Sequence, residues 1–85
     1  MKRIGVIGIV IQARTGEIAL EVQKILSAFS DVIIGRMGVP APEEGISAIA
    51  LIVRGENERI SALSGKLGRL ENVNVKSALS GVELE

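Results

Sequence analysis

The sequence of 85 residues lacks cysteine, histidine, tryptophan and tyrosine, and it holds a single phenylalanine. Without imidazole and thiol groups, it offers no histidine general base, no cysteine nucleophile and none of the usual ligands of zinc, iron–sulfur clusters or haem. An aromatic content of 1% leaves almost no surface on which nucleic-acid bases could stack. These absences argue against most enzymes, and we expect no catalytic residue, metal or cofactor.

An excess of charge is also missing, because ten basic and ten acidic residues give a formal net charge of zero. No long-range field therefore attracts a nucleic-acid backbone or an anionic membrane. Charged residues and glycines interrupt every apolar run before the roughly 20 residues of a membrane span. The segment 4–11 follows two basic residues, but it contains Gly5 and Gly8 and lacks a cleavage site of small residues, unlike a signal peptide. We expect a cytoplasmic protein with no membrane partner.

The hydrophobic residues, 47% of the chain, are spaced as in alternating strands and helices. Short β-branched runs predict strands over 3–12, 32–39, 46–54 and 73–79. Gly35 and Gly38 in the second of these indicate a bulge or a close backbone approach. Residues 40–45, with two prolines, predict an exposed, mobile loop, and Gly81 begins a tail.

Two segments have helical periodicity. The first begins at Glu17 after Thr15 as N-cap, and its apolar face comprises Ile18, Val22, Ile25, Leu26 and Phe29. The second begins after Asn57 as N-cap, has an apolar stripe of Ile60, Leu63, Leu67 and Leu70, and ends near Gly68.

The predicted order β-α-β-β-α-β is typical of a ferredoxin-like α+β sandwich, in which two helices cover one face of a four-stranded antiparallel sheet. We expect one domain over residues 1–85, with Leu84 and Glu85 as a candidate cloning remnant.

Both faces of the central strands are apolar. In the first strand Ile7, Ile9 and Ile11 share one face, while Ile4, Val6 and Val10 share the other. In the third strand Ile46, Ala48, Ala50 and Ile52 oppose Ile49, Leu51 and Val53. Because an open apolar face of several hundred Å² is uncommon on a monomer, we expect the open face to be buried in a homo-oligomer, a dimer or a tetramer. The alternative is that a loop or the tail covers it.

Three glycine pairs invite a phosphate-binding interpretation, but none forms a P-loop or a dinucleotide fingerprint. The segment 65–68 resembles the backbone-clamping loop of KH domains, although its place in the pattern favours the end of a helix.

Two arginines are the most interesting charges. Arg14 lies in the turn before the first helix, where free N–H groups attract an anion or a carboxylate. Arg36 interrupts an apolar strand between two glycines, and it is as well explained by a ligand as by an edge charge that discourages aggregation.

Four strings resemble the small bacterial proteins described as iron-only hydrogenase system regulators. They are Ile-Gly-Arg-Met-Gly-Val-Pro (34–40), Gly-Ile-Ser-Ala-Ile-Ala-Leu-Ile-Val (45–53), Ile-Ser-Ala-Leu-Ser-Gly-Lys-Leu-Gly (60–68) and Val-Lys-Ser-Ala-Leu (75–79), so the resemblance covers nearly the whole chain. The fold of this family is similar to ACT domains and to the C-terminal domain of the nickel-responsive repressor. The resemblance implies a regulatory or small-molecule-sensing module, assembled through its sheets and linked to hydrogenase maturation or expression.

The resemblance also implies a ligand site. The histidine and cysteine ligands of the nickel-responsive repressor are missing, so nickel sensing does not transfer. No DNA-binding arm precedes Met1, and we do not expect direct DNA binding. ACT domains bind amino acids near the first strand–helix turn at a subunit interface. By that analogy a small carboxylate or amino acid would bind Gln12, Arg14, Thr15 and Gly16, with Gly35 and Arg36 supplied by a neighbouring copy.

Two other functions remain as alternatives. An RNA-binding ferredoxin-like domain would use the basic residues Arg59, Lys66 and Arg69 of the second helix, but it would lack stacking aromatics. A small ferredoxin-like enzyme would have to rely on Arg14, Arg36, Glu17 or a bound cofactor.

Overall fold

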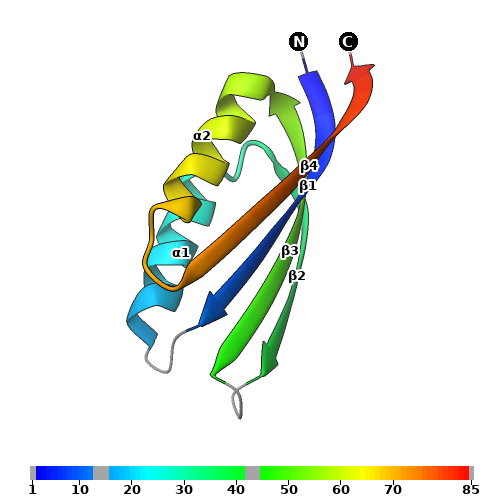
Figure 1. Cartoon of the computed structure of the whole chain (residues 1–85). Helices are drawn as coiled ribbons and strands as arrows, with labels where there is room; N and C mark the ends of the chain where they lie inside the picture. Colours follow the sequence, from blue (N-terminus) through cyan, green and yellow to red (C-terminus); the bar gives the residue numbers. More distant parts are fainter. Residues whose placement is uncertain (1, 13–15, 42–44, 85) are drawn as a thin grey trace.

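A computed structural model describes residues 2–12, 16–41 and 45–84 of the chain. The elements are β1 (Lys2–Gln12), α1 (Gly16–Ala28), β2 (Ile33–Ala41), β3 (Ile46–Glu56), α2 (Asn57–Gly68) and β4 (Val73–Leu84). The strands form one antiparallel sheet in the order β2-β3-β1-β4, and both helices lie on the same side of it (Figure 1). The predicted ferredoxin-like sandwich is confirmed.

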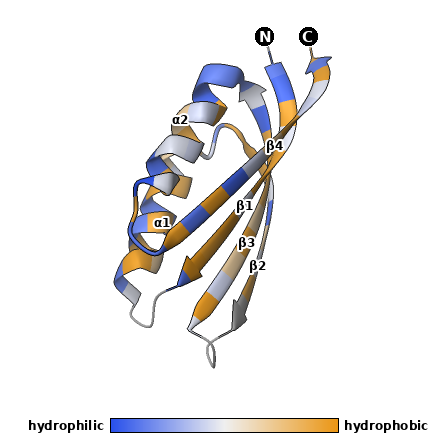
Figure 2. Cartoon of the chain, in the orientation of Figure 1, coloured by the Kyte–Doolittle hydropathy of each residue, from blue (hydrophilic) through white to orange (hydrophobic). Residues whose placement is uncertain are grey.

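The core lies between the helices and one face of the sheet. Ile7, Ile9 and Ile11 of β1 are buried there, as the alternation in this strand predicts. They pack in one cluster with Leu51 and Val53 of β3, Val22 and Leu26 of α1, and Ile60, Leu63 and Leu67 of α2. Figure 2 shows hydrophobic residues along most of β1, which lies inside the sheet between β3 and β4. The helix stripes read from the sequence are thus the buried faces.

All four strands extend beyond the predicted bounds, and in β2 and β4 the added residues belong to the predicted loop and the predicted tail. Pro40 and Ala41 continue β2, where they pair with Ser47 and Ile46, so assigning them to the loop was wrong. Proline has no backbone N–H to donate to a neighbouring strand. It is tolerated here because β2 is an edge strand, which has a neighbour on one side only. The rest of the predicted mobile loop, at 42–44, lies outside the described residues. The tail predicted from Gly81 is instead the end of β4, which pairs with the start of β1 through Leu84 and Lys2.

The predicted helix caps fare differently. Asn57 is the first residue of α2, and the N-cap position belongs to Glu56, which makes no side-chain capping bond, so the Asn57 cap was wrong. The backbone of Glu56 is still extended because the residue ends β3, and helical geometry begins only after it. Thr15, the predicted cap of the first helix, lies outside the described residues. Gly65 and Gly68 lie within α2, which excludes a KH-type loop between helices.

Glycines mark both irregular places in the sheet. The register of β2 against β3 shifts between Ile33 and Gly35, which confirms the bulge predicted there. A second shift lies between Arg3 and Gly5, where β1 meets β4. A Cβ atom on Gly5 would lie 2.8 Å from the carbonyl oxygen of Ala78 and 2.9 Å from Leu79 Cδ1. Only glycine lets β4 cross β1 this closely.

Replacing Gly5 with Ala should therefore destabilise the fold, because the new methyl group meets backbone that cannot move freely. We expect the free energy of unfolding in urea to fall by about 1–3 kcal/mol. Gly65→Ala is the matched control, since no heavy atom lies within 4 Å of its added Cβ. In the middle of a helix it should raise the stability by about 0.5–1 kcal/mol. A Gly5→Ala variant as stable as the wild type would contradict the close approach.

Candidate functional site

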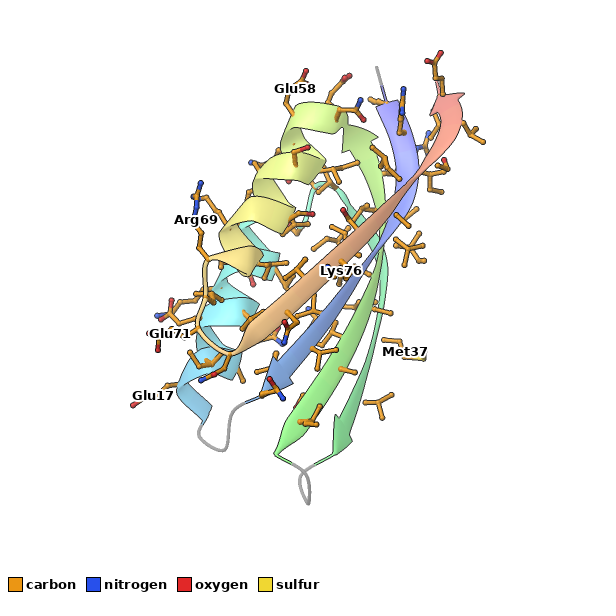
Figure 3. All side chains as sticks on the ribbon, in the orientation of Figure 1. Glu17, Met37, Glu58, Arg69, Glu71 and Lys76 are labelled. Atoms are coloured by element: carbon orange, nitrogen blue, oxygen red, sulfur yellow. The ribbon has the colours of Figure 1, made fainter. Side chains whose placement is uncertain are left out.

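The sheet face away from the helices is apolar and uncovered in the single chain. Large side chains stand on it from three strands, and Met37 on β2 projects away from the helices (Figure 3). They are Val6, Val10, Met37, Val39 and Ile52. Between them lie the small residues Gly8, Ala48 and Ala50, which leave a hollow of about 370 Å³. The open face expected from the sequence is confirmed as exposed hydrophobic surface.

Four of the predicted ligand residues belong to the segment 12–16, of which the structure describes Gln12 and Gly16. Gln12 ends β1, and its backbone N–H donates a 2.8 Å hydrogen bond to the carbonyl of Asn72. Gly16 is the exposed first residue of α1. Arg14 and Thr15 lie outside the described residues.

The other two ligand residues lie on β2. Arg36 is opposite Leu51, on the helix side of the sheet, and its Nη2 donates a 3.1 Å hydrogen bond to Oε1 of Gln23 on α1. Gly35 is opposite Ile52, on the open face. Leu51 in turn pairs with Ile7, five positions from Gln12, which is about 17 Å along the strand. Within one chain, Gln12 and Arg36 therefore belong to different places.

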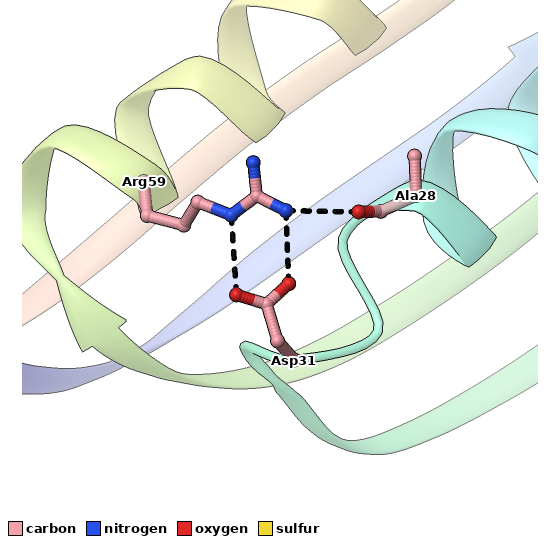
Figure 4. A network of polar contacts seen from close by, with 3 residues as sticks. All are labelled: Ala28, Asp31 and Arg59. Atoms are coloured by element: carbon pink, nitrogen blue, oxygen red, sulfur yellow. Dashed lines mark hydrogen bonds and ion pairs between the residues drawn. The ribbon is translucent and has the colours of Figure 1, made fainter.

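Arg59, named from the sequence only as a candidate RNA-binding residue, connects α2 to the end of α1 and the turn that follows it. Arg59 of α2 binds Asp31 through two parallel hydrogen bonds of 2.9 and 3.2 Å, and it donates a third of 2.9 Å to the carbonyl of Ala28 (Figure 4). Its guanidinium also lies 4.1 Å from the centre of the Phe29 ring, with the Lys66 ammonium at 5.7 Å. Arg59 is therefore engaged within the chain, which weakens the RNA-binding alternative.

No cluster of three or more acidic residues suited to a metal ion occurs among the described residues. Glu21 forms an exposed ion pair with Lys24 at 3.6 Å. In the described ranges, no helix is long and apolar enough to cross a membrane.

The hydrogen bond from Arg59 lowers the pKa of Asp31 below its ordinary value of 3.8. The pair thus stabilises the fold above that value, and the effect is lost as the pH falls through the lowered pKa. We expect Asp31→Asn to be less stable than the wild type at about pH 6, and the difference in unfolding free energy to vanish in strong acid. The difference should be modest because both side chains are exposed. Urea denaturation across this pH range tests it, and an equal pH-dependent loss in Glu71→Gln would contradict the assignment to this pair.

Solved structures share this fold. The uncharacterized protein TM1266 from Thermotoga maritima is 35% identical, with a TM-score of 0.88 over 93% of this chain and 98% of that one. The ACT domain from GTP pyrophosphokinase of Chlorobium tepidum is 22% identical, with a TM-score of 0.71 over 92% of this chain and 100% of that one. A protein described as a "putative glycine cleavage system transcriptional repressor" is 16% identical, with a TM-score of 0.68 over 98% of this chain and 48% of that one.

None of the curated proteins matches this chain. The family described as "TM1266-like: Iron-only hydrogenase system regulator, putative" matches residues 3–77. Because this match spans most of the sequence, from β1 into β4, the chain belongs to the TM1266-like family.

Proposed function

We propose that this chain is a non-enzymatic, cytoplasmic regulatory module of an iron-only hydrogenase system, and that it senses a small molecule as a homo-oligomer. The description of the family supports the regulatory role. The likeness to an ACT domain supports the architecture, which is a sheet with one face left free for assembly. The observation that carries the proposal is the uncovered apolar face.

The shape of this face suits a second copy of itself. Met37 and Val39 form a ridge on β2, and Gly8, Ala48 and Ala50 form the hollow beside it. In a two-fold assembly the ridge of each copy can fill the hollow of the other, because the same patch serves on both sides. Among the charged residues of this face, Arg54 is near the end of β3, and Lys76, opposite Gly8 on the edge strand β4, lines one side of the hollow.

The size of the face is sufficient for a small interface. The four strands are 9 to 12 residues long, and the stretch of about eight residues over which all of them are paired, at a spacing of about 4.8 Å, forms a face of about 500 Å². Burying it on two copies removes about 1,000 Å² from water, which is the lower limit of a specific interface. A tetramer would add contacts through other surfaces.

The proposed ligand is a small carboxylate or amino acid. Free N–H groups at the start of α1 and the guanidinium of Arg14 would hold its carboxylate, together with Gln12, Thr15 and Gly16. Because Arg36 and Gly35 are distant from Gln12 within one chain, these two residues would be supplied by a neighbouring copy. Ligand binding would then depend on assembly.

The wild type should be an oligomer by light scattering and native mass spectrometry. Met37→Glu places a charge on the open face and should weaken association by roughly tenfold or more, because that charge would lose its hydration. Leu20→Glu is the matched control: Leu20 on α1 is 63% exposed against 67% for Met37, but lies away from this face. A monomeric wild type, or dissociation by Leu20→Glu alone, would refute the interface.

Titration calorimetry with the proteinogenic L-amino acids tests the ligand site. At least one should bind the wild type, and Arg14→Ala and Arg36→Ala should each lower its affinity by about tenfold or more, since a charge-assisted hydrogen bond is lost. Arg69→Ala removes a charge elsewhere and should leave the affinity unchanged. Wild-type affinity in both test variants would rule out the clamp.

A further inference from the structure

A separate cavity lies between α2 and β4, on the helix side of the sheet. Ser61 and Ser64 of α2 and Ser77 of β4 line it, and Ile7, Ile60 and Leu79 contribute apolar walls. We call it the serine cavity. Its volume of about 220 Å³ corresponds to about seven water molecules. The small serine side chains leave this space open where the long aliphatic residues of the core would have filled it.

The hydroxyl of Ser64 is unused. Its Oγ atom is buried and has no hydrogen-bond partner within the described part of the chain. A buried hydroxyl that has lost its water partners destabilises a fold unless something else pairs with it. The Ser64 hydroxyl can both donate and accept a hydrogen bond, so it suits an amide, a carbonyl or an alcohol.

Two more buried polar atoms, one on α2 and one on β1, also lack a hydrogen-bond partner among the described residues. Asn57, Ser61 and Ser64 are spaced as i, i+4 and i+7, which places them on one face of α2. The Oδ1 atom of Asn57 is buried without a partner, as is Nε of Arg3. Arg3 pairs with Glu83 of β4 and approaches its carboxylate to 3.8 Å. Buried polar atoms without a hydrogen-bond partner thus occur in the first two turns of α2 and at the start of β1.

The residues that line the serine cavity favour a neutral ligand over a charged one. Among the residues that the structure describes, no charged side chain lines the serine cavity, so an ionised carboxylate or ammonium would lose hydration without gaining a partner charge. A neutral polar group would be paired by the serine hydroxyls, and a short alkyl body would contact Ile60 and Leu79. This chemistry differs from the carboxylate expected near Arg14.

We propose that the serine cavity binds a small neutral molecule, with an amide, carbonyl or hydroxyl group hydrogen-bonded to Ser64 Oγ and a short apolar body against Ile60 and Leu79. The serine hydroxyls and Ile60 lie on the helix side of the sheet, and Val6 and Ala78, which belong to the open face, complete the lining.

A series of probes with one carbon skeleton tests the charge selection. Butyramide is neutral, butyrate is an anion and butylammonium is a cation at neutral pH. In ¹H–¹⁵N NMR spectra, butyramide should shift the amide signals of Ser61, Ser64 and Ser77 in a saturable way. Butyrate and butylammonium should bind at least about tenfold more weakly, because each must lose the hydration of its charge. Equal binding of all three, or butyramide shifts elsewhere on the protein, would overturn the proposal.

Two variants test the role of Ser64. Ser64→Ala should weaken butyramide binding about three- to tenfold through the lost hydrogen bond. Ser64→Val adds volume and should abolish it, while unchanged signals from α1 and β2 show that the variant is folded. Ser27→Ala removes a hydroxyl on α1 and should bind like the wild type. Wild-type affinity in Ser64→Ala would overturn the proposal, as would the absence of saturable shifts up to the solubility limit of butyramide, which would show that water alone fills the cavity.

Discussion

The whole structure depends on one constraint: two helices can cover only one face of a four-stranded sheet. The helix-side aliphatic residues of β1 and β3 are buried under α1 and α2, and this burial is the main source of stability in a chain almost without aromatic residues. The same strands place Val10, Ile52 and their neighbours on the other face, where they are exposed and no described element covers them. The proposed assembly rests on this surplus of apolar surface.

The two proposed ligand sites differ in whether they require a second copy of the chain. The proposed carboxylate site draws on Gln12 at one end of β1 and on Arg36 of β2, so it requires more than one copy. The serine cavity is formed within one chain, because residues of α2, β4, β1 and β3 line it. A regulator built in this way could respond to a charged ligand through assembly and to a neutral ligand through the packing of α2 on the sheet.

Sequence reasoning succeeded where periodicity decides the structure. The alternation in β1 and the stripe through Ile60, Leu63 and Leu67 gave the element order and the buried faces, because burial acts on every turn and every second strand residue. The predictions from the sequence were wrong or missing where contacts between residues distant in the sequence determine the structure. Pro40 joins β2 because that strand is at an edge, and β4 passes Gly81 because β1 continues beside it. The Arg59–Asp31 pair spans 28 positions, and the unpaired Ser64 hydroxyl depends on packing against β4, so no local pattern signals either.

Oxidation of Met37 tests whether a second copy covers the open sheet face. Met37 is 67% exposed in the single chain, and its thioether is the reactive group at the middle of the ridge. The account predicts that peroxide converts Met37 to the sulfoxide slowly in concentrated protein and much faster on dilution, as the copies separate. Oxidation at the rate of a methionine in an unfolded peptide, at every protein concentration, would contradict it.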